Sequence, residues 1–275
     1  SPSSLPPVQR GEKGPKNFST TTSTLTLLGS LSIKPDSNNS TMVDSPHLPD
    51  GLGDTYPVCL DLFCGVGGVC RTLHSYGARP VWDVIGIDID GSKADTYPGH
   101  FVEYDLREGL PGFVDDLEFD IAWASPACTF ATALQFQRSG ENLIPLARDL
   151  LKQADASFTV IENVPDAREH LDAPSQFCGG AFGLGVQKHR LFETSFFSHG
   201  TPCDHPDGGF DFCIGDREAP VEEYRAAHGF APNASIRTKQ LRECIPPAYV
   251  EELQEQYLIY ECGGSRTTTQ AAGTP

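Results

Sequence analysis

A cysteine after a short apolar run is the first residue in this sequence whose type and position could do chemistry. Cys128 lies in the stretch WASPACTF, residues 123–130. A thiol at the end of a strand can act as a nucleophile, but a lone cysteine after Pro-Ala is more commonly a small residue packed in a core or turn. Other segments must therefore decide between a reactive and a structural cysteine.

Two segments carry charged groups that could act together with this thiol. The sequence ENV, residues 162–164, ends a predicted strand, and VQKHRLFE, residues 186–193, supplies Arg190 next to an apolar run. Neighbouring parallel strands end at the same edge of a sheet, where ligands of open α/β sheets bind. We therefore expect Glu162 to lie at the same edge as Cys128, with Arg190 as a cation of the same site.

A glycine-rich segment predicts a cofactor site. In DLFCGVGG, residues 61–68, the glycines follow a strand and open a helix, where missing Cβ atoms let backbone N–H groups approach a ligand. This pattern implies a nucleotide-like cofactor. A dinucleotide fingerprint would require a third glycine at position 70, which is Cys70, so the pattern disfavours NAD.

Two acidic residues could recognise such a cofactor. Asp88 lies at the tip of the second predicted strand and is placed to accept hydrogen bonds from ribose hydroxyls. Asp105, in VEYDL, is a candidate for binding an adenine amino group, with an ordinary surface acid as the alternative.

The elements that would position these residues alternate between strands and helices. Gly77 would end a helix after the glycine-rich segment, Leu and Ile recur at helical spacing in residues 143–155, and prolines open a last helix at 246–260. Apolar runs predict strands at residues 58–63, 82–90, 119–126 and 157–164. Such repeated units predict an α/β fold with a mostly parallel sheet and helices on both faces.

Composition and charge narrow the class of protein further. The chain has 275 residues and a net charge of −17, and residues 1–56 hold four basic and five acidic residues, so nearly all of the excess belongs to the body. An acidic body argues against non-specific coating of nucleic acid, so any such contact must use a local basic patch. The nine cysteines are odd in number and irregularly spaced, without a convincing signal peptide or membrane anchor, which predicts reduced thiols in a cytoplasm.

Taken in order, these motifs resemble those of the DNA (cytosine-5) methyltransferases. The family's first motif is matched in full at residues 61–68, and its Glu-Asn-Val motif at 162–164. The nucleophile motif, usually Pro-Pro-Cys-Gln, is Pro-Ala-Cys-Thr at 126–129, the Arg-x-Arg motif is Lys-His-Arg at 188–190, and CIPPAY at 244–249 is similar to the closing motif. The matches span about residues 57–260. The substitutions Ala127, Thr129 and Lys188 leave in place every group that the chemistry requires.

The resemblance implies a Rossmann-like class I methyltransferase fold, with S-adenosylmethionine as the cofactor and C5 of a flipped cytosine as the methyl acceptor. Cys128 would add to C6 of the ring, Glu162 would stabilise the charge that develops near N3, and Arg190 would bind the O2 edge. The cofactor-binding residues would be Asp61, Phe63, Gly65, Gly67, Gly68, Asp88, Asp105 and Pro126. The substrate-binding residues would be Asn163, Lys188, Gln135 and Arg138.

The resemblance and the composition together predict five regions. These are a disordered leader at 1–56, a catalytic cofactor-binding domain at 57–196, a small irregular target-recognition region at 197–235, a C-terminal helix at 236–262 and a disordered tail at 263–275. The expected partner is double-stranded DNA, with a cognate restriction endonuclease as a further one. We expect a monomer in the cytoplasm of a prokaryote or of a virus-infected host.

Three other functions remain compatible with the sequence. An RNA cytosine methyltransferase could use the same scaffold, because the motifs read the base rather than the sugar. The altered residues beside Cys128 would suit an inactive cofactor-binding regulatory protein, although intact Glu162 and Arg190 oppose it. A small-molecule methyltransferase would not need both Cys128 and Glu162.

The short region at 197–235 also raises the question of a metal. Cys203, His205 and Cys213 lie in it and could form a zinc site with Cys178. Their spacing matches no strong zinc signature, so free thiols are the favoured reading and no metal ligand is predicted.

Overall fold

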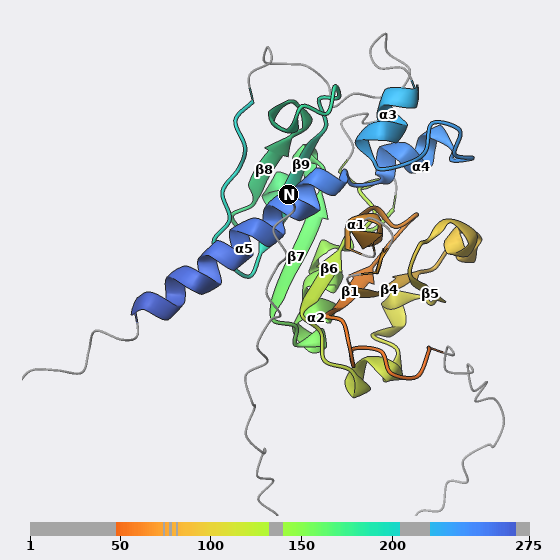
Figure 1. Cartoon of the computed structure of the whole chain (residues 1–275), viewed down its shortest axis with the longest axis vertical. Helices are drawn as coiled ribbons and strands as arrows, with labels where there is room; N and C mark the ends of the chain where they lie inside the picture. The colour runs from red at the N-terminus through yellow and green to blue at the C-terminus, as the bar shows by residue number, and fades with distance from the viewer. Residues whose placement is uncertain are drawn as a thin grey trace, which may run out of the picture. The chain divides into compact units, whose positions relative to one another are not determined.

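Short apolar segments build a seven-stranded sheet within the described part of this computed structural model (Figure 1). The structure describes residues 48–73, 75–76, 79–80, 82–131, 140–203 and 221–267. The strands of the sheet are β1 (Val58–Leu62), β4 (Asp83–Asp88), β5 (His100–Glu103), β6 (Ile121–Ala124), β7 (Phe158–Asn163), β8 (Ser175–Cys178) and β9 (His189–Thr194). A separate short pair is formed by β2 (Ser75–Tyr76) and β3 (Arg79–Pro80).

The strand order is β5-β4-β1-β6-β7-β9-β8, and its centre is parallel. β1 pairs in parallel with both β4 and β6, β4 with β5, and β6 with β7, whereas β9 is antiparallel to both β7 and β8. The order reverses direction between β1 and β6, which places a ligand crevice beyond the carboxyl ends of these strands. The predicted Rossmann-like fold is therefore confirmed.

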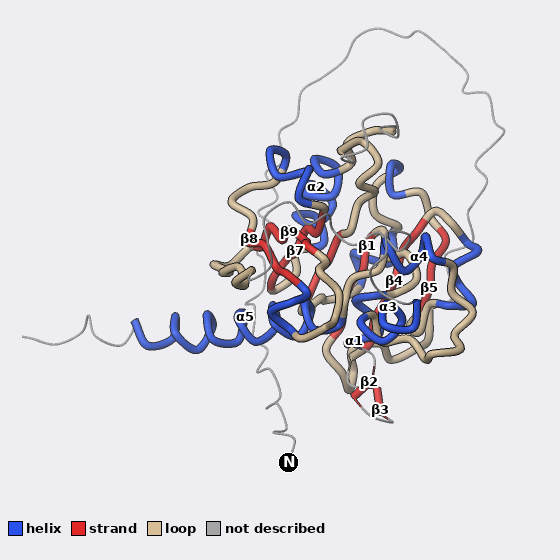
Figure 2. Tube along the Cα trace, turned by 90° about the horizontal axis from the view of Figure 1, so that it is seen from above, coloured by secondary structure: helices blue, strands red, loops and turns tan. Residues whose placement is uncertain are grey.

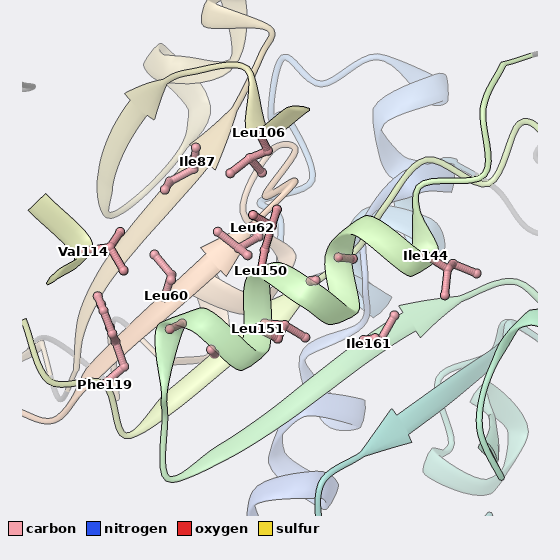
Figure 3. Packing of buried hydrophobic residues seen from close by; sticks show 14 of the residues in the cluster. Leu60, Leu62, Ile87, Leu106, Val114, Phe119, Ile144, Leu150, Leu151 and Ile161 are labelled. Atoms are coloured by element: carbon pink, nitrogen blue, oxygen red, sulfur yellow. The ribbon is translucent and has the colours of Figure 1, made fainter. Parts of the chain in front are cut away.

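Alternating side chains of the central strands pack into two hydrophobic clusters, one on each face of the sheet. On one face Leu60 and Leu62 of β1 pack with Leu150 and Leu151 of α2 (Ile144–Ala154), as Figure 3 shows. On the other face, Cys59 packs in a cluster with residues of α1 (Gly68–Leu73) and α5 (Pro247–Thr267). Figure 2 shows α2 on one side of the strands and α1 with α5 on the other. This arrangement follows from the two-residue period of a strand, and a sheet covered on both faces explains the nearly unbroken apolar run of β1.

The remaining helical elements are short. Two α-helices, α3 (Val221–Ala227) and α4 (Thr238–Glu243), precede α5. The 3₁₀ turns are Gly91–Thr96, Leu106–Glu108, Gly112–Asp116, Pro165–His170 and Gly179–Phe182. Among the described residues, no helix combines the length and the apolar character needed to cross a bilayer.

Two predicted boundaries need correction. Residues 48–56 are part of the fold rather than of a leader, because Leu48 and Leu52 pack against the core and the Gly53 N–H donates to Asp83 Oδ2 at 2.9 Å. The last helix continues to Thr267, past the predicted end at residue 262. The rest of the leader and most of the tail lie outside the described residues.

The region predicted as irregular, 197–235, contains α3 and contributes to the body. Tyr224 and Phe230 are buried in a third core cluster with Val66 from the glycine-rich segment and Leu241 of α4. This region is therefore not a separable domain. Its residues 204–220 lie outside the described part of the chain.

Candidate active site

Cys128 lies just beyond the carboxyl end of β6 and is half-buried. The turn that carries it is tied to the next strand, since Asn163 Nδ2 donates to the Pro126 carbonyl at 3.0 Å. The Asn163 amide oxygen accepts in turn from the Val164 N–H at 3.0 Å, and the Ala131 N–H closes the turn on the Cys128 carbonyl at 3.0 Å. Buried Asn163 therefore positions the cysteine turn, and its predicted contact with the substrate stays a prediction.

Glu162 and Arg190 form a buried ion pair beside this turn. The Arg190 Nε lies 2.8 Å from Glu162 Oε1, and both side chains are less than a tenth exposed. The arginine is held from two further sides, because its terminal nitrogens donate to the carbonyls of His189 at 2.7 Å and Arg242 at 3.0 Å. Antiparallel pairing of β7 with β9 brings the two residues together, with Glu162 opposite Phe192. The pair is therefore fixed in position before any ligand binds.

Burial sets the protonation of this site. It raises the pKa of Glu162, and Arg190 and Lys188 only partly oppose that rise. Burial also raises the pKa of the Cys128 thiol, while the positive charge of Arg190 lowers it and the Glu162 carboxylate raises it. Arg190 is thus the charge that favours the thiolate, and Glu162 is a carboxyl group that can hold a proton more readily than an exposed one.

A hydroxyl group that the sequence analysis missed also contacts Glu162. Ser125 hydrogen-bonds the Glu162 carboxyl group, and the Ser125 Oγ accepts from Trp123 Nε1 at 3.0 Å. All of Trp123 is buried in β6. The sequence could have pointed to Ser125 as a site residue, because it is the first residue after the strand that leads to Cys128.

Lys188, whose predicted contact with the substrate stays a prediction, is bound on several sides by the protein. Its ammonium group is buried, where it donates to the carbonyls of Leu241, Arg242 and Cys244 and contacts His228 Nε2 at 2.8 Å. The last carbonyls of a helix lack partners within the helix, and Lys188 satisfies those at the end of α4. This lysine therefore ties the chain just before β9 to the residue that follows α3 and to the end of α4.

The glycine-rich segment forms the loop between β1 and α1, and its glycines serve two purposes. Gly65 adopts φ +57°, and among the described residues other than its two chain neighbours, no heavy atom lies within 4 Å of the place where its Cβ would stand. A Cβ on Gly68 would instead come within 2.7 Å of the Ile245 backbone nitrogen. Gly67 (φ +83°) packs against Pro98 in the same way. Gly65 thus leaves room for a ligand, whereas the other two allow close packing.

Asp61 and Asp88 flank this loop. Asp61 is buried at the end of β1, its Oδ2 accepts from the Tyr97 hydroxyl at 3.1 Å, and its Oδ1 has no hydrogen-bond partner among the described residues. Burial raises its pKa to about 8. Asp88, the last residue of β4, accepts from the Gly65 N–H at 3.0 Å and from Lys93 Nζ at 2.9 Å. Its carboxylate therefore fixes the position of the loop relative to β4.

These residues fit a nucleoside cofactor with a cationic group. The unsatisfied Asp61 oxygen would gain a partner from such a group, and the space at Gly65 would admit the ligand. Ile89, which directly follows Asp88 and is 56% exposed, offers an apolar surface for a base. Half-buried Phe63, at φ +55°, packs against the core below the loop.

Three predicted ligand contacts remain, those of Asp105, Gln135 and Arg138. Asp105 forms a bidentate pair with Arg107, with nitrogen–oxygen distances of 2.9 and 2.6 Å, and this bonding lowers its pKa. An adenine amino group would therefore have to compete with Arg107 for the Asp105 carboxylate. Gln135 and Arg138 lie outside the described residues.

Comparisons with solved structures return methyltransferases. A mutant of Spodoptera frugiperda DNMT2 is 17% identical with a TM-score of 0.37, over 55% of this chain and 53% of that chain. The Entamoeba histolytica methyltransferase EhMeth is 12% identical with a TM-score of 0.43, over 73% and 97%. The plantazolicin methyltransferase BpumL, in complex with a pentazolic desmethylPZN analog and SAH, is 19% identical with a TM-score of 0.28, over 42% of each chain.

No protein-family model matches the sequence, and no curated protein matches it significantly. Because the identities and TM-scores to the solved structures are low, the function has to come from this chain's own site residues.

Proposed function

We propose that this chain is an S-adenosylmethionine-dependent cytosine-5 methyltransferase that acts on DNA. The observation that carries this proposal is the buried Glu162–Arg190 pair, 2.8 Å between Nε and Oε1, beside Cys128 at the carboxyl edge of the sheet. The glycine loop that could hold a nucleoside cofactor opens at the same edge. A small-molecule methyltransferase would have no use for a thiol, a carboxyl group and a guanidinium in this arrangement.

Cys128 is the proposed nucleophile. Cytosine C5 is a poor nucleophile until a thiolate adds at C6, which forms a sulfur–carbon bond and moves an electron pair toward C5 and N3. Arg190 favours the thiolate that this addition requires. Loss of the C5 proton to a base and cleavage of the sulfur–carbon bond later restore the ring and the thiol group.

Glu162 and Arg190 are the proposed binding groups for the base. Burial raises the pKa of Glu162, so its carboxyl group can supply a proton or a hydrogen bond at N3 as charge develops there. Arg190 is fixed by the Glu162 carboxylate and by its backbone partners at His189 and Arg242, and from this position its guanidinium would bind the O2 edge. Ser125 positions Glu162, and Asn163 positions the turn that carries Cys128.

The proposed cofactor would be held by Asp61, Gly65, Asp88 and Ile89. When bound, S-adenosylmethionine supplies the electrophilic methyl group that C5 receives. Asp61 would bind its ammonium group, because ionised Asp61 otherwise has one oxygen without a partner among the described residues.

Covalent trapping on oligonucleotides that contain 5-fluorocytosine tests this proposal. Fluorine at C5 cannot leave as a proton does, so the adduct with Cys128 persists when the cofactor is present. We expect a cofactor-dependent complex with double-stranded DNA, stable in denaturing gels, and its loss in Cys128→Ala. Cys262→Ser, which alters an exposed cysteine in α5, is the matched control. Trapping on RNA alone would overturn the DNA assignment, and trapping in Cys128→Ala would overturn the mechanism.

A further inference from the structure

A cluster of three side chains outside the proposed active site has the composition of a metal centre. Cys178, His189 and Cys203 place their Sγ and ring nitrogen atoms all within 4.8 Å of one another. Cys178 is fully buried, His189 is 9% exposed and Cys203 is exposed. From the sequence, both cysteines were expected to be free thiols, and His189 was not expected to be a ligand.

The fold brings these residues together from three segments. Cys178 ends β8 and stands directly opposite His189, the first residue of β9, so their side chains share one face of the sheet. Residues 200–203 then run back along β8, because the Thr201 N–H donates to the Gln176 carbonyl and the Cys178 N–H donates to Thr201 Oγ1, each at 2.9 Å. These two bonds hold Cys203 over Cys178.

The distances fit tetrahedral metal ligation better than a disulfide. The two Sγ atoms are 3.8 Å apart, and His189 Nε2 lies 3.2 Å from Cys203 Sγ. Zinc–sulfur bonds of about 2.3 Å and zinc–nitrogen bonds of about 2.0 Å at tetrahedral angles give separations of roughly 3.8 and 3.5 Å. A disulfide requires about 2.05 Å between the sulfur atoms.

We propose that Cys178, His189 and Cys203 bind a Zn²⁺ ion. Two thiolates and a neutral imidazole suit this ion, and the two thiolates offset its charge, so a largely buried site carries no net charge. A water molecule would complete the tetrahedron. Successive side chains of a strand point to opposite faces, so the ion lies on the face of β9 away from Arg190.

A bound ion would also restrain a residue that holds Arg190 of the proposed active site. The His189 carbonyl accepts a hydrogen bond from Arg190 at 2.7 Å, and the ion would fix the residue that carries this carbonyl. Zinc would thus clamp β8, β9 and the chain before residue 204 into one unit. This inference does not depend on the proposed reaction.

Metal content of the purified full-length chain tests the site. Without chelators and under reducing conditions, we expect about one zinc per chain by elemental mass spectrometry. Cys178→Ser, His189→Asn and Cys203→Ser should each lower zinc retention by at least about tenfold. Cys262→Ser and His199→Asn change exposed residues of the same types and should retain the metal. Zinc that stays bound in all three site variants would overturn the proposal.

Cobalt binding gives a readout that does not require the variants to fold. Titration of Co²⁺ into the metal-free wild-type chain should produce the thiolate charge-transfer and tetrahedral d–d absorption of a two-sulfur site, and Zn²⁺ should displace it. A folded wild-type chain that gives neither zinc nor this spectrum would overturn the proposal. So would a Cys178–Cys203 disulfide in peptides mapped from the freshly purified protein.

Discussion

At the scale of single residues, the Glu162 carboxyl group should matter for the rate more than for the fold. Glu162→Gln keeps the shape and a hydrogen-bonding group but can no longer hold or release the proton. One preorganised group at a developing charge is commonly worth about 10²–10³-fold in rate, so we expect kcat to fall by that factor. Single-turnover methylation measures it. Near-normal turnover in this variant would remove Glu162 from the reaction.

Asp61 should cost stability in the free protein. Burial raises the pKa of Asp61 from an ordinary 3.8 to about 8, so the folded chain favours the protonated carboxyl group. The stability that this protonated group contributes is fully present below about pH 3.8 and is lost as the pH rises through about 8. Asp61→Asn cannot ionise and keeps an acceptor for Tyr97. We expect urea unfolding at pH 8 to show a gain on the order of 1 kcal/mol, smaller at pH 5.

The same substitution should weaken cofactor binding, because the ammonium group of the cofactor would lose its counter-charge. Calorimetric titration with S-adenosylhomocysteine measures this loss. Asp116→Asn, at an exposed acid, is the matched control for both measurements. If Asp61→Asn binds the cofactor normally, Asp61 has only a structural role.

The residues at the active site differ in how far the sequence predicts them. Cys128 and Glu162 follow from one local rule, because both come just after or at the end of neighbouring parallel strands. Lys188 does not, because its partners are carbonyls more than fifty residues later that become available where α4 ends. The positioning role of Asn163 was not predictable either, because its hydrogen bond to the Pro126 carbonyl depends on tertiary structure.

At the scale of elements, the contact between His228, just after α3, and Lys188, just before β9, should make the fold sensitive to acid. His228 is buried in a neutral form, with Nδ1–H donating to the Tyr224 carbonyl and Nε2 accepting from Lys188, and burial lowers its pKa to about 2. Its contribution to stability is therefore present above the ordinary pKa of 6.5 and is lost progressively as the pH falls toward about 2.

We expect this histidine alone to steepen the fall in unfolding free energy by up to about 1.4 kcal/mol per pH unit below pH 6.5. Urea unfolding between pH 7 and pH 5 measures the slope. His228→Gln should be less stable at pH 7 but should show a shallower slope. His199→Gln, at an exposed histidine, should keep the wild-type slope, and equal slopes in the two variants would contradict the prediction.

The elements themselves were largely predictable where the hydrophobic period was clear. The strands before Cys128 and at Glu162, and the helix at 144–154, agree with their predicted positions within a few residues. Helix α3 was missed because it is short and lies among Gly, Pro and Asp residues. The Cys178–His189 pairing was missed because strand register, unlike sequence spacing, appears only in the folded sheet.

At the scale of the whole molecule, the boundary of the N-terminal segment can be located by truncation. A chain that begins at Met42 should keep the stability and activity of the full chain, because the composition of the preceding residues offers no core. A chain that begins at Pro57 loses the packing of Leu48 and Leu52 and the Gly53–Asp83 hydrogen bond. We expect it to lose about 1–3 kcal/mol and to melt several degrees lower by calorimetry.

A lower melting temperature for the chain that begins at Met42 would show that residues 1–41 stabilise the body. Identical melting temperatures for the two truncated chains would show that Leu48 and Leu52 contribute nothing.

The close approach of Gly68 to Ile245 determines when the glycine-rich loop can gain its packing partner during synthesis. The glycine loop is among the first parts of the body to leave the ribosome, yet the backbone against which Gly68 packs is made about 180 residues later. Because translation adds roughly 5–20 residues per second, the backbone that packs against the loop is made on the order of ten seconds or more after the loop itself. We therefore expect the glycine-rich loop to lack its support until Ile245 has been made, and a fragment released earlier to have this loop unformed.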